Sequence, residues 1–91
     1  MKKSTLLKKL GGFVKVQNVQ TNQIVINFEN GKVFQSYESI IAIKLNNNDA
    51  LYLGDDYNYS MTTSKYLNKV FGFTSKECTN KIKEGVFKLI K

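Results

Sequence analysis

Hydrophobic and polar residues alternate through the first half of the chain, which is the pattern of β-strands that bury one face. The alternation predicts five strands, over 13–20, 23–29, 32–37, 39–45 and 50–53. The fourth strand is apolar on both faces, with Ile41, Ile43 and Leu45 on one face and Ile40 and Ala42 on the other. Such a strand is expected at the centre of its sheet.

Asn30-Gly31 lies between two alternating runs and favours a type I′ hairpin turn, because both central residues of that turn need a positive φ. The turn predicts a register with the pairs Glu29–Lys32, Phe28–Val33, Ile26–Gln35 and Ile24–Tyr37. The first pair places opposite charges beside the turn, which stabilises the hairpin.

Helical spacing replaces the alternation in the second half of the chain. A helix is predicted over 63–71 from an apolar stripe of Tyr66, Leu67, Val70 and Phe71. Ser60 or Thr62 is expected to cap its start, and Gly72 to end it. A helix this short is unstable alone, so its apolar face is expected to pack on the sheet.

A second helix is predicted immediately after the first, because Thr74 and Glu77 have the spacing of a capping box. Cys78 and Ile82 would form its buried edge. Two short helices joined by so tight a turn resemble a helix-turn-helix unit, although a plain helical hairpin has the same geometry. The motif alone is therefore weak evidence for DNA binding.

The two ends of the chain each allow two interpretations. Residues 82–91 either continue as helix, or end it at Gly85 and form a final strand over 86–90; the β-branched residues and the glycine favour the strand. A helix over 3–10, capped by Ser4 or Thr5, precedes Gly11-Gly12. Residues 1–11 are then either a packing segment or a mobile basic arm, and the leucines favour packing.

These elements predict one α+β domain over residues 1–91, with a small antiparallel sheet of about five strands, a sixth at the C-terminus, and two or three short helices. A hairpin beside the helical pair would make the fold winged-helix-like. No apolar run approaches the roughly 20 residues that span a bilayer, and the N-terminus lacks the features of a signal peptide. The single cysteine, Cys78, favours the cytoplasm and is expected to be a buried hydrophobe.

Positive charge is concentrated at the two ends of the sequence. Residues 1–10 have four lysines and no acid, and residues 63–91 have seven lysines against two acids, whereas residues 11–62 have a net charge of −2. Clustered lysines attract polyanions. All fourteen basic residues are lysine, however, and the absence of arginine weakens the case for direct reading of guanine. A purely solubilising surface is the competing explanation.

No catalytic set is visible, so the chain is predicted not to be an enzyme. It has no histidine to activate a serine or cysteine nucleophile. Asp55-Asp56, with Asp49 nearby, contains only part of a cation site, and a solvated turn is the favoured interpretation. Neither a metal nor a cofactor is predicted.

The candidate nucleic-acid contacts are lysines and neutral hydrogen-bonding residues of the predicted helical pair, together with Lys32 of the hairpin. The set is Lys32, Thr62, Thr63, Ser64, Lys65, Lys69, Lys76, Thr79, Asn80, Lys81 and Lys83. The helix start at 62–64 also offers free amides and a dipole that suit a phosphate. In this hypothesis the lysines hold phosphates, and Asn80 or Thr79 touches bases.

Two segments resemble a family of small uncharacterised proteins of phages and conjugative elements. They contain Phe34-Gln-Ser-Tyr37, Ile40-Ile-Ala42 and Tyr59-Ser-x-Thr62-Thr-Ser-Lys-Tyr-Leu-Asn68, and the resemblance covers roughly residues 31–72. It implies a mobile element of a low-GC Gram-positive host and no assigned chemistry. Such elements encode small proteins that bind their own DNA, and others that disable host defences.

The leading hypothesis is a non-enzymatic DNA-binding accessory or regulatory protein of a mobile element, acting at a plasmid transfer origin or a phage operator. Double-stranded DNA is the expected partner, and a homodimer is expected because one such module offers little surface for tight specific binding. The alternative hypothesis is a protein-binding inhibitor of a host factor or defence system, which would use the sheet edge or the basic face.

Overall fold

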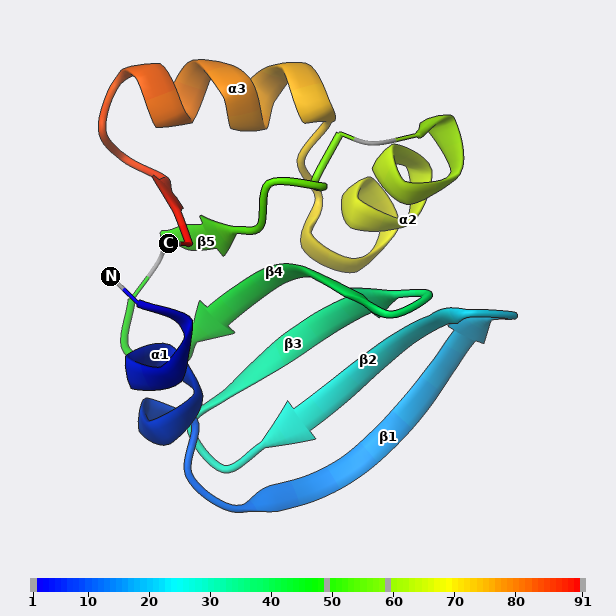
Figure 1. The fold of residues 1–91 in the computed structure, drawn as a ribbon, viewed down its shortest axis with the longest axis vertical. Helices are drawn as coiled ribbons and strands as arrows, with labels where there is room; N and C mark the ends of the chain where they lie inside the picture. Colours follow the sequence, from blue (N-terminus) through cyan, green and yellow to red (C-terminus); the bar gives the residue numbers. More distant parts are fainter. Residues whose placement is uncertain (1, 49, 59, 91) are drawn as a thin grey trace.

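The computed structural model describes residues 2–48, 50–58 and 60–90, and within them six strands form one sheet with helices on both of its faces (Figure 1). The α+β prediction is confirmed, including the strand at the C-terminus. The elements are α1 (Lys3–Lys9), β1 (Phe13–Gln20), β2 (Gln23–Phe28), β3 (Gly31–Ser36), β4 (Ser39–Leu45), β5 (Leu51–Leu53), α2 (Met61–Phe71), α3 (Ser75–Lys83) and β6 (Lys88–Leu89).

The strands lie in sequence order, β1 to β6, and the first five are antiparallel to their neighbours. β6 returns after the two helices and pairs parallel to β5, where the Ile90 amide also donates to the Leu53 carbonyl at 2.8 Å. Gly85, with φ +80°, turns the chain from α3 towards this strand. The strand interpretation of the C-terminus is therefore confirmed, although β6 has only two residues.

The predicted type I′ turn at Asn30-Gly31 is wrong. The two-residue turn is Glu29-Asn30, so that Phe28 pairs with Gly31 and Ile26 with Val33. Neither Asn30 nor Gly31 has a positive φ. The glycine is needed for space instead, because a Cβ at position 31 would collide with the carbonyl oxygen of Lys44 and lie 2.8 Å from Leu10 Cδ2. The register shift is two residues, so every side chain of β2 and β3 keeps the face that was predicted.

A β-bulge in β4 corrects the predicted division of its side chains. Phe34 pairs with Ala42 but Gln35 pairs with Ile40, which leaves Ile41 as the extra residue. Ile41 therefore points to the same face as Ala42, whereas Ile43 points to the opposite face. The central position predicted for β4 is confirmed, since it lies between β3 and β5.

The helix boundaries follow local capping chemistry. The Ser60 hydroxyl accepts from the Thr63 amide at 3.1 Å, so α2 begins two residues before the predicted start, and Gly72 ends it with φ +83°. The predicted capping box of Thr74 and Glu77 is present at α3. α1 begins after Lys2 without a side-chain cap, so the prediction of Ser4 or Thr5 as its cap is wrong.

Each face of the sheet has its own core. α2 and α3 cover one face, which we call the two-helix face, and bury Phe34, Leu53, Leu67 and Cys78. α1 lies on the opposite face, the one-helix face, where Leu6 and Leu10 are fully buried against Val33, Ile43 and Tyr52. Figure 1 shows α1 on one side of the sheet, away from α2 and α3. Leu6 and Leu10 thus pack on the sheet as predicted, whereas Leu7 is exposed.

Candidate nucleic-acid interface

The outer side of α2 has two exposed lysines, Lys65 and Lys69, in a helix that contains no acidic residue. Both ammonium groups lie over the ring of Tyr66, at 5.4 and 5.8 Å from its centroid. The tyrosine itself is buried, so the ring is a fixed platform. Cation–π contacts of this kind are worth about 0.5–1 kcal/mol at exposed sites. Both charges therefore lie beside the same ring of α2.

Lysines of the sheet form a second positive group. Lys15 pairs with Asn27, Asn27 with Lys32 and Lys32 with Lys44, so the three lysines form one row across β1 to β4. The row lies on the two-helix face, because the residues next to Asn27, Lys32 and Lys44 in β2, β3 and β4 point into the core of the other face, and Lys15 is the partner of Asn27. Lys32 reaches α2, where its ammonium lies 5.3 Å from the centroid of the Phe71 ring.

Sequence reasoning included Lys32 but missed Lys15 and Lys44. Each is a single lysine within a strand, and nothing in the local pattern links them. Only the register brings them together, with no acidic residue in the row. A correct register derived from sequence would have been the signal, and the predicted turn gave the wrong partner for Lys32.

α3 presents a mixed surface. Lys76, Asn80 and Lys83 are exposed on it, but so are Glu77 and Glu84. The Glu77 carboxylate accepts from the Thr74 amide at 3.0 Å, and that bond and the one to the Thr74 side chain lower the pKa of Glu77. A carboxylate held ionised at the start of α3 reduces its attraction for phosphate.

Lys81 is not displayed freely on α3. Its ammonium lies over two rings, 5.8 Å from the centroid of Phe73 and 5.5 Å from that of Phe87. Those rings pack edge to face at 5.1 Å, and Phe87 is buried. Lys81 therefore covers an aromatic pair that joins the turn before α3 to the segment after it.

Two of the predicted hydroxyl contacts point into the protein. Thr63 is 2 % exposed and its Oγ1 lies 3.3 Å from the Ser36 hydroxyl. Thr79 Oγ1 donates to the Ser75 carbonyl at 3.0 Å and lies 2.6 Å from the Tyr57 hydroxyl, which must therefore be the donor of that second bond. These side chains fasten α2 and α3 to the rest of the fold, and only Thr79, which is half-buried, still reaches the surface.

The start of α2 is a poorer phosphate site than the sequence suggested. The Thr63 amide donates to the Ser60 hydroxyl, and the Ser64 amide donates to the Ser60 carbonyl at 3.0 Å. Thr62 is exposed and Ser64 is half-buried. Of the predicted set, the structure thus places Lys65 and Lys69 together beside Tyr66 of α2, whereas Lys32 lies beside Phe71, on the other flank of the helix.

The helical pair has the predicted tight turn, but the hairpin does not project beside it. Gly72, Phe73 and Thr74 separate α2 from α3. In the β2–β3 turn, the amides of Glu29 and Asn30 donate to the carbonyls of Gly12 and Leu10, each at 2.9 Å. The turn is thus held beside the end of α1, and Lys32 contributes through its side chain alone.

The lysines at the start of the chain belong to a different surface. Lys2, Lys3, Lys8 and Lys9 lie in or beside α1, on the one-helix face of the sheet (Figure 1). They lie on the other face of the sheet from Lys65 and Lys69, whereas Lys88 of β6 pairs with Tyr52 and shares their face.

Other chemistry finds little support in the described residues. They contain no group of three or more potential metal ligands, and Asp49, part of the cation site considered above, lies outside them. Cys78 is fully buried, and burial raises the pKa of its thiol to about 11, which opposes a nucleophilic role. No helix in the described ranges is long and apolar enough to cross a membrane.

Fold and surface together define a small α+β protein with an open six-stranded sheet in its described part, and with lysines gathered around one helix. The chain belongs to the family of unknown function DUF8033, whose profile matches residues 7–87. No curated protein and no solved structure gives a significant match. The match spans α1 to the buried Phe87, so the family includes both faces of the sheet.

Proposed function

We propose that this protein binds double-stranded DNA through the two-helix face, as a non-enzymatic accessory or regulatory protein of a mobile genetic element, homodimeric and cytoplasmic. One observation supports the DNA contact above all others. Lys65 and Lys69 lie side by side at Tyr66 on a helix without acids, and Lys32 lies at the other flank of the same helix. A helix with positive charge on it and beside it, and no acid of its own, attracts the phosphates of a duplex.

In this proposal the contacts divide by chemistry. The lysines of α2 and of the sheet row hold phosphates, and the exposed Asn80 of α3 reaches a base edge, for which its amide is suited. Binding that depends mainly on phosphate contacts weakens steeply with salt. The assignment to a mobile element rests on the resemblance of residues 31–72, and its sharpest test is a search for a preferred duplex in the gene's own neighbourhood.

The experiment is a salt-titrated gel shift with short duplexes from the gene's own locus and with scrambled duplexes. The test variant replaces Lys32, Lys65 and Lys69 by glutamine. The matched control replaces Lys2, Lys3 and Lys8 by glutamine, which removes the same charge from the other face of the sheet. The slope of log K against log salt should fall by about 0.9 for each lost phosphate contact in the test variant and remain unchanged in the control. An equal fall of the slope in both variants would mean that binding depends only on net charge, and it would overturn the proposed surface.

A second function is favoured by β1. This edge strand exposes three apolar side chains, with Phe13 63 % exposed, Val14 55 % and Val16 50 %. An exposed apolar edge suits the addition of a strand from another protein, as required of an inhibitor of a host factor. Val16→Lys should then abolish capture of the host protein and leave the DNA gel shift unchanged. Loss of DNA binding in this variant would instead connect β1 to the first function.

The homodimer is tested separately by sedimentation equilibrium of the wild-type chain alone. Because the expected dimer supplies the surface that one small module lacks, the chain should associate at the concentrations at which the gel shift is complete. A monomer under those conditions would remove the dimer from the proposal.

A further inference from the structure

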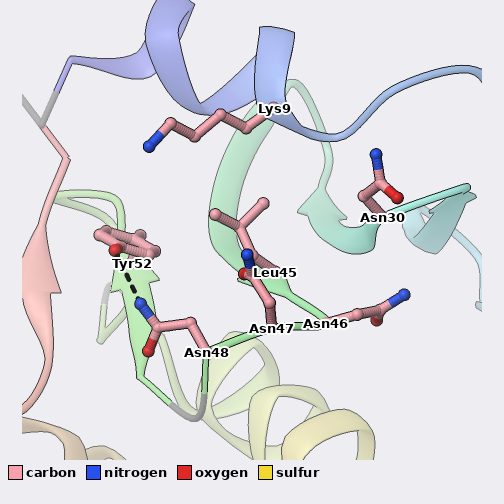
Figure 2. Close-up of a pocket in the computed structure, with 7 residues that line it drawn as sticks. All are labelled: Lys9, Asn30, Leu45, Asn46, Asn47, Asn48 and Tyr52. Carbon is pink, nitrogen blue, oxygen red and sulfur yellow. Dashed lines mark hydrogen bonds between the residues drawn. The ribbon is translucent and has the colours of Figure 1, made fainter.

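A cavity of about 610 Å³ opens on the one-helix face, remote from the lysines of α2. Its walls come from three places: Lys9 at the end of α1, Asn30 in the β2–β3 turn, and Asn46 to Asn48 in the segment after β4 (Figure 2). Leu45 and Tyr52, both largely buried, complete the lining. The volume lies within the roughly 300–1,000 Å³ that is usual for small-molecule sites.

One end of the cavity is organised to donate hydrogen bonds. The Asn48 Oδ1 accepts from the Ala50 amide at 2.9 Å, which fixes the orientation of this side chain, and its Nδ2 donates to the Tyr52 hydroxyl oxygen at 3.2 Å. Because that oxygen already accepts, the proton of Tyr52 is left to donate elsewhere. No acceptor for it is seen in the described part of the chain. Figure 2 shows the Lys9 side chain extending above the cavity towards Tyr52.

Lys9 and Tyr52 thus form a pair of donors above and below one volume, and no carboxylate of the described residues lines the cavity. An ammonium and a phenolic proton that converge in this way fit an anionic group, such as a phosphate or a carboxylate. The buried ring of Tyr52 fixes the position of its hydroxyl, whereas Lys9 is exposed and can move onto a ligand.

The other end of the cavity presents side-chain amides. The backbone of Asn30 is already used, because its amide donates to the Leu10 carbonyl and its carbonyl accepts from the Asn46 amide at 2.8 Å. The side chains of Asn30 and Asn47 also line the cavity, and Leu45 provides an apolar surface between the two ends (Figure 2). An amide offers a donor and an acceptor side by side, which is the pattern that matches the edge of a nucleobase.

We infer that this cavity binds a small nucleotide, with its phosphate between Lys9 and Tyr52 and its base against the asparagine amides and Leu45. The inference does not depend on DNA binding by α2, because the two surfaces lie on opposite faces of the sheet. It also gives Lys9 a role that the other lysines of α1 do not share, since Lys9 alone among them lines the cavity.

The test is a titration of the isotope-labelled full chain with adenosine monophosphate, followed by NMR through the backbone and asparagine side-chain amides. Shifts should concentrate at Asn30, Asn47, Asn48 and Tyr52. Adenosine and inorganic phosphate, titrated separately, should each bind at least about tenfold more weakly, because each engages only one end of the cavity. If adenosine binds as tightly as the monophosphate, Lys9 and Tyr52 do not bind the phosphate. If inorganic phosphate binds as tightly, the asparagine amides and Leu45 do not bind the base. Saturating monophosphate without shifts at these residues would overturn the site.

Two variants complete the test. Lys9→Gln should weaken binding of the monophosphate by about tenfold, because a charge-assisted hydrogen bond is lost. Lys8 is an exposed neighbour outside the cavity, so Lys8→Gln should leave the affinity unchanged. Equal effects of the two variants would reduce the interaction to general attraction by α1. Lys8→Gln also serves as the folding control, because it makes the same chemical change on the same helix.

Discussion

The two faces of the sheet are covered very differently, although one chain of 91 residues supplies both. On the two-helix face, α2 and α3 are capped by Ser60 and Thr74, and they bury a continuous core that includes Leu67, Cys78 and Phe87. On the one-helix face, a single helix of seven residues without a side-chain cap buries Leu6 and Leu10. The remainder of that face, towards β1, leaves apolar side chains in solvent.

The two faces also present different surfaces for binding. The face with the complete core has lysines over aromatic rings, whereas the face with the incomplete core has the cavity and the exposed strand. A short uncapped helix opens at lower cost than two capped ones, so the one-helix face is expected to be the more mobile of the two. Each proposed function therefore uses a surface of different rigidity.

The largest effect is expected from deletion of core side chains on each face. Leu67→Ala should cost about 3–5 kcal/mol in free energy of unfolding, because Leu67 is fully buried. The helix that contains it packs on the sheet and cannot easily shift to fill the space that the side chain leaves. Leu6→Ala should cost less, about 2–3 kcal/mol, because the short α1 can shift to fill the gap. Chemical denaturation measures both. A larger loss for Leu6 would reverse the ranking of the two faces.

The next effect is on thiol reactivity. Burial raises the pKa of Cys78 from 9.0 to about 11, so at pH 8 its thiolate is about a hundredfold rarer than in the unfolded chain. A thiolate-selective reagent should therefore modify the native protein at least about a hundredfold more slowly than the denatured one. The neutral thiol is the form that the fold favours. Its contribution to stability is complete below pH 9 and is lost as the pH rises through 11.

The matched experiment moves the thiol to the other face. In a Cys78→Ala chain, Leu6→Cys places a thiol at another fully buried position, on the helix that lacks a side-chain cap. This thiol should react faster than the one in α3, because opening of α1 alone exposes it. Equal protection of the two thiols would show that the faces open together.

Much of this fold is visible in the sequence, where local chemistry decides the structure. The cap at Thr74, the stop at Gly72 and the strand after Gly85 each depend on a few adjacent residues, and all were predicted. The turn at Glu29-Asn30 was not, because Gly31 serves a contact with Lys44 and Leu10, which are remote in sequence. The bulge at Ile41 is invisible for the same reason, since it depends on the strand beside it.

The candidate site shows the same limit. Lys65 and Lys69 are four residues apart in a predicted helix, so their shared side could be inferred from the sequence. Thr63 and Thr79 occupy equally polar positions, but tertiary partners such as Ser36 and Tyr57 turn them inward. The row that contains Lys15 and Lys44 exists only after four strands are aligned. The local sequence pattern thus predicts the lysines of α2, whereas the lysines of the sheet depend on strand pairing between distant segments.

A glycine pair tests the packing of the one-helix face. Gly31→Ala should cost about 1–3 kcal/mol, because the new methyl group must displace both Leu10 at the end of α1 and the β4 backbone at Lys44. Gly72→Ala is the control on the two-helix face, where nothing lies within 4 Å and only the positive φ opposes the change, at about 1 kcal/mol. Denaturation midpoints compare them. A smaller loss of stability for Gly31→Ala than for Gly72→Ala would mean that α1 and its surroundings rearrange easily, and that the one-helix face is even more mobile than expected.

The smallest effect concerns the capping box of α3 on the two-helix face. Thr74→Ala should cost about 1 kcal/mol, because the Glu77 amide loses the threonine hydroxyl that accepts from it at 3.1 Å. The hydrogen bonds from Thr74 lower the pKa of Glu77, so the stabilisation by this carboxylate is present above its ordinary value of 4.5 and is lost as the pH falls through the lowered one. Glu77→Gln should therefore be less stable than wild type at pH 7, and the difference should shrink on acidification. A difference that is the same at pH 7 and pH 3 would mean that the ionised carboxylate contributes nothing, and that the rigidity of this face comes from its core alone.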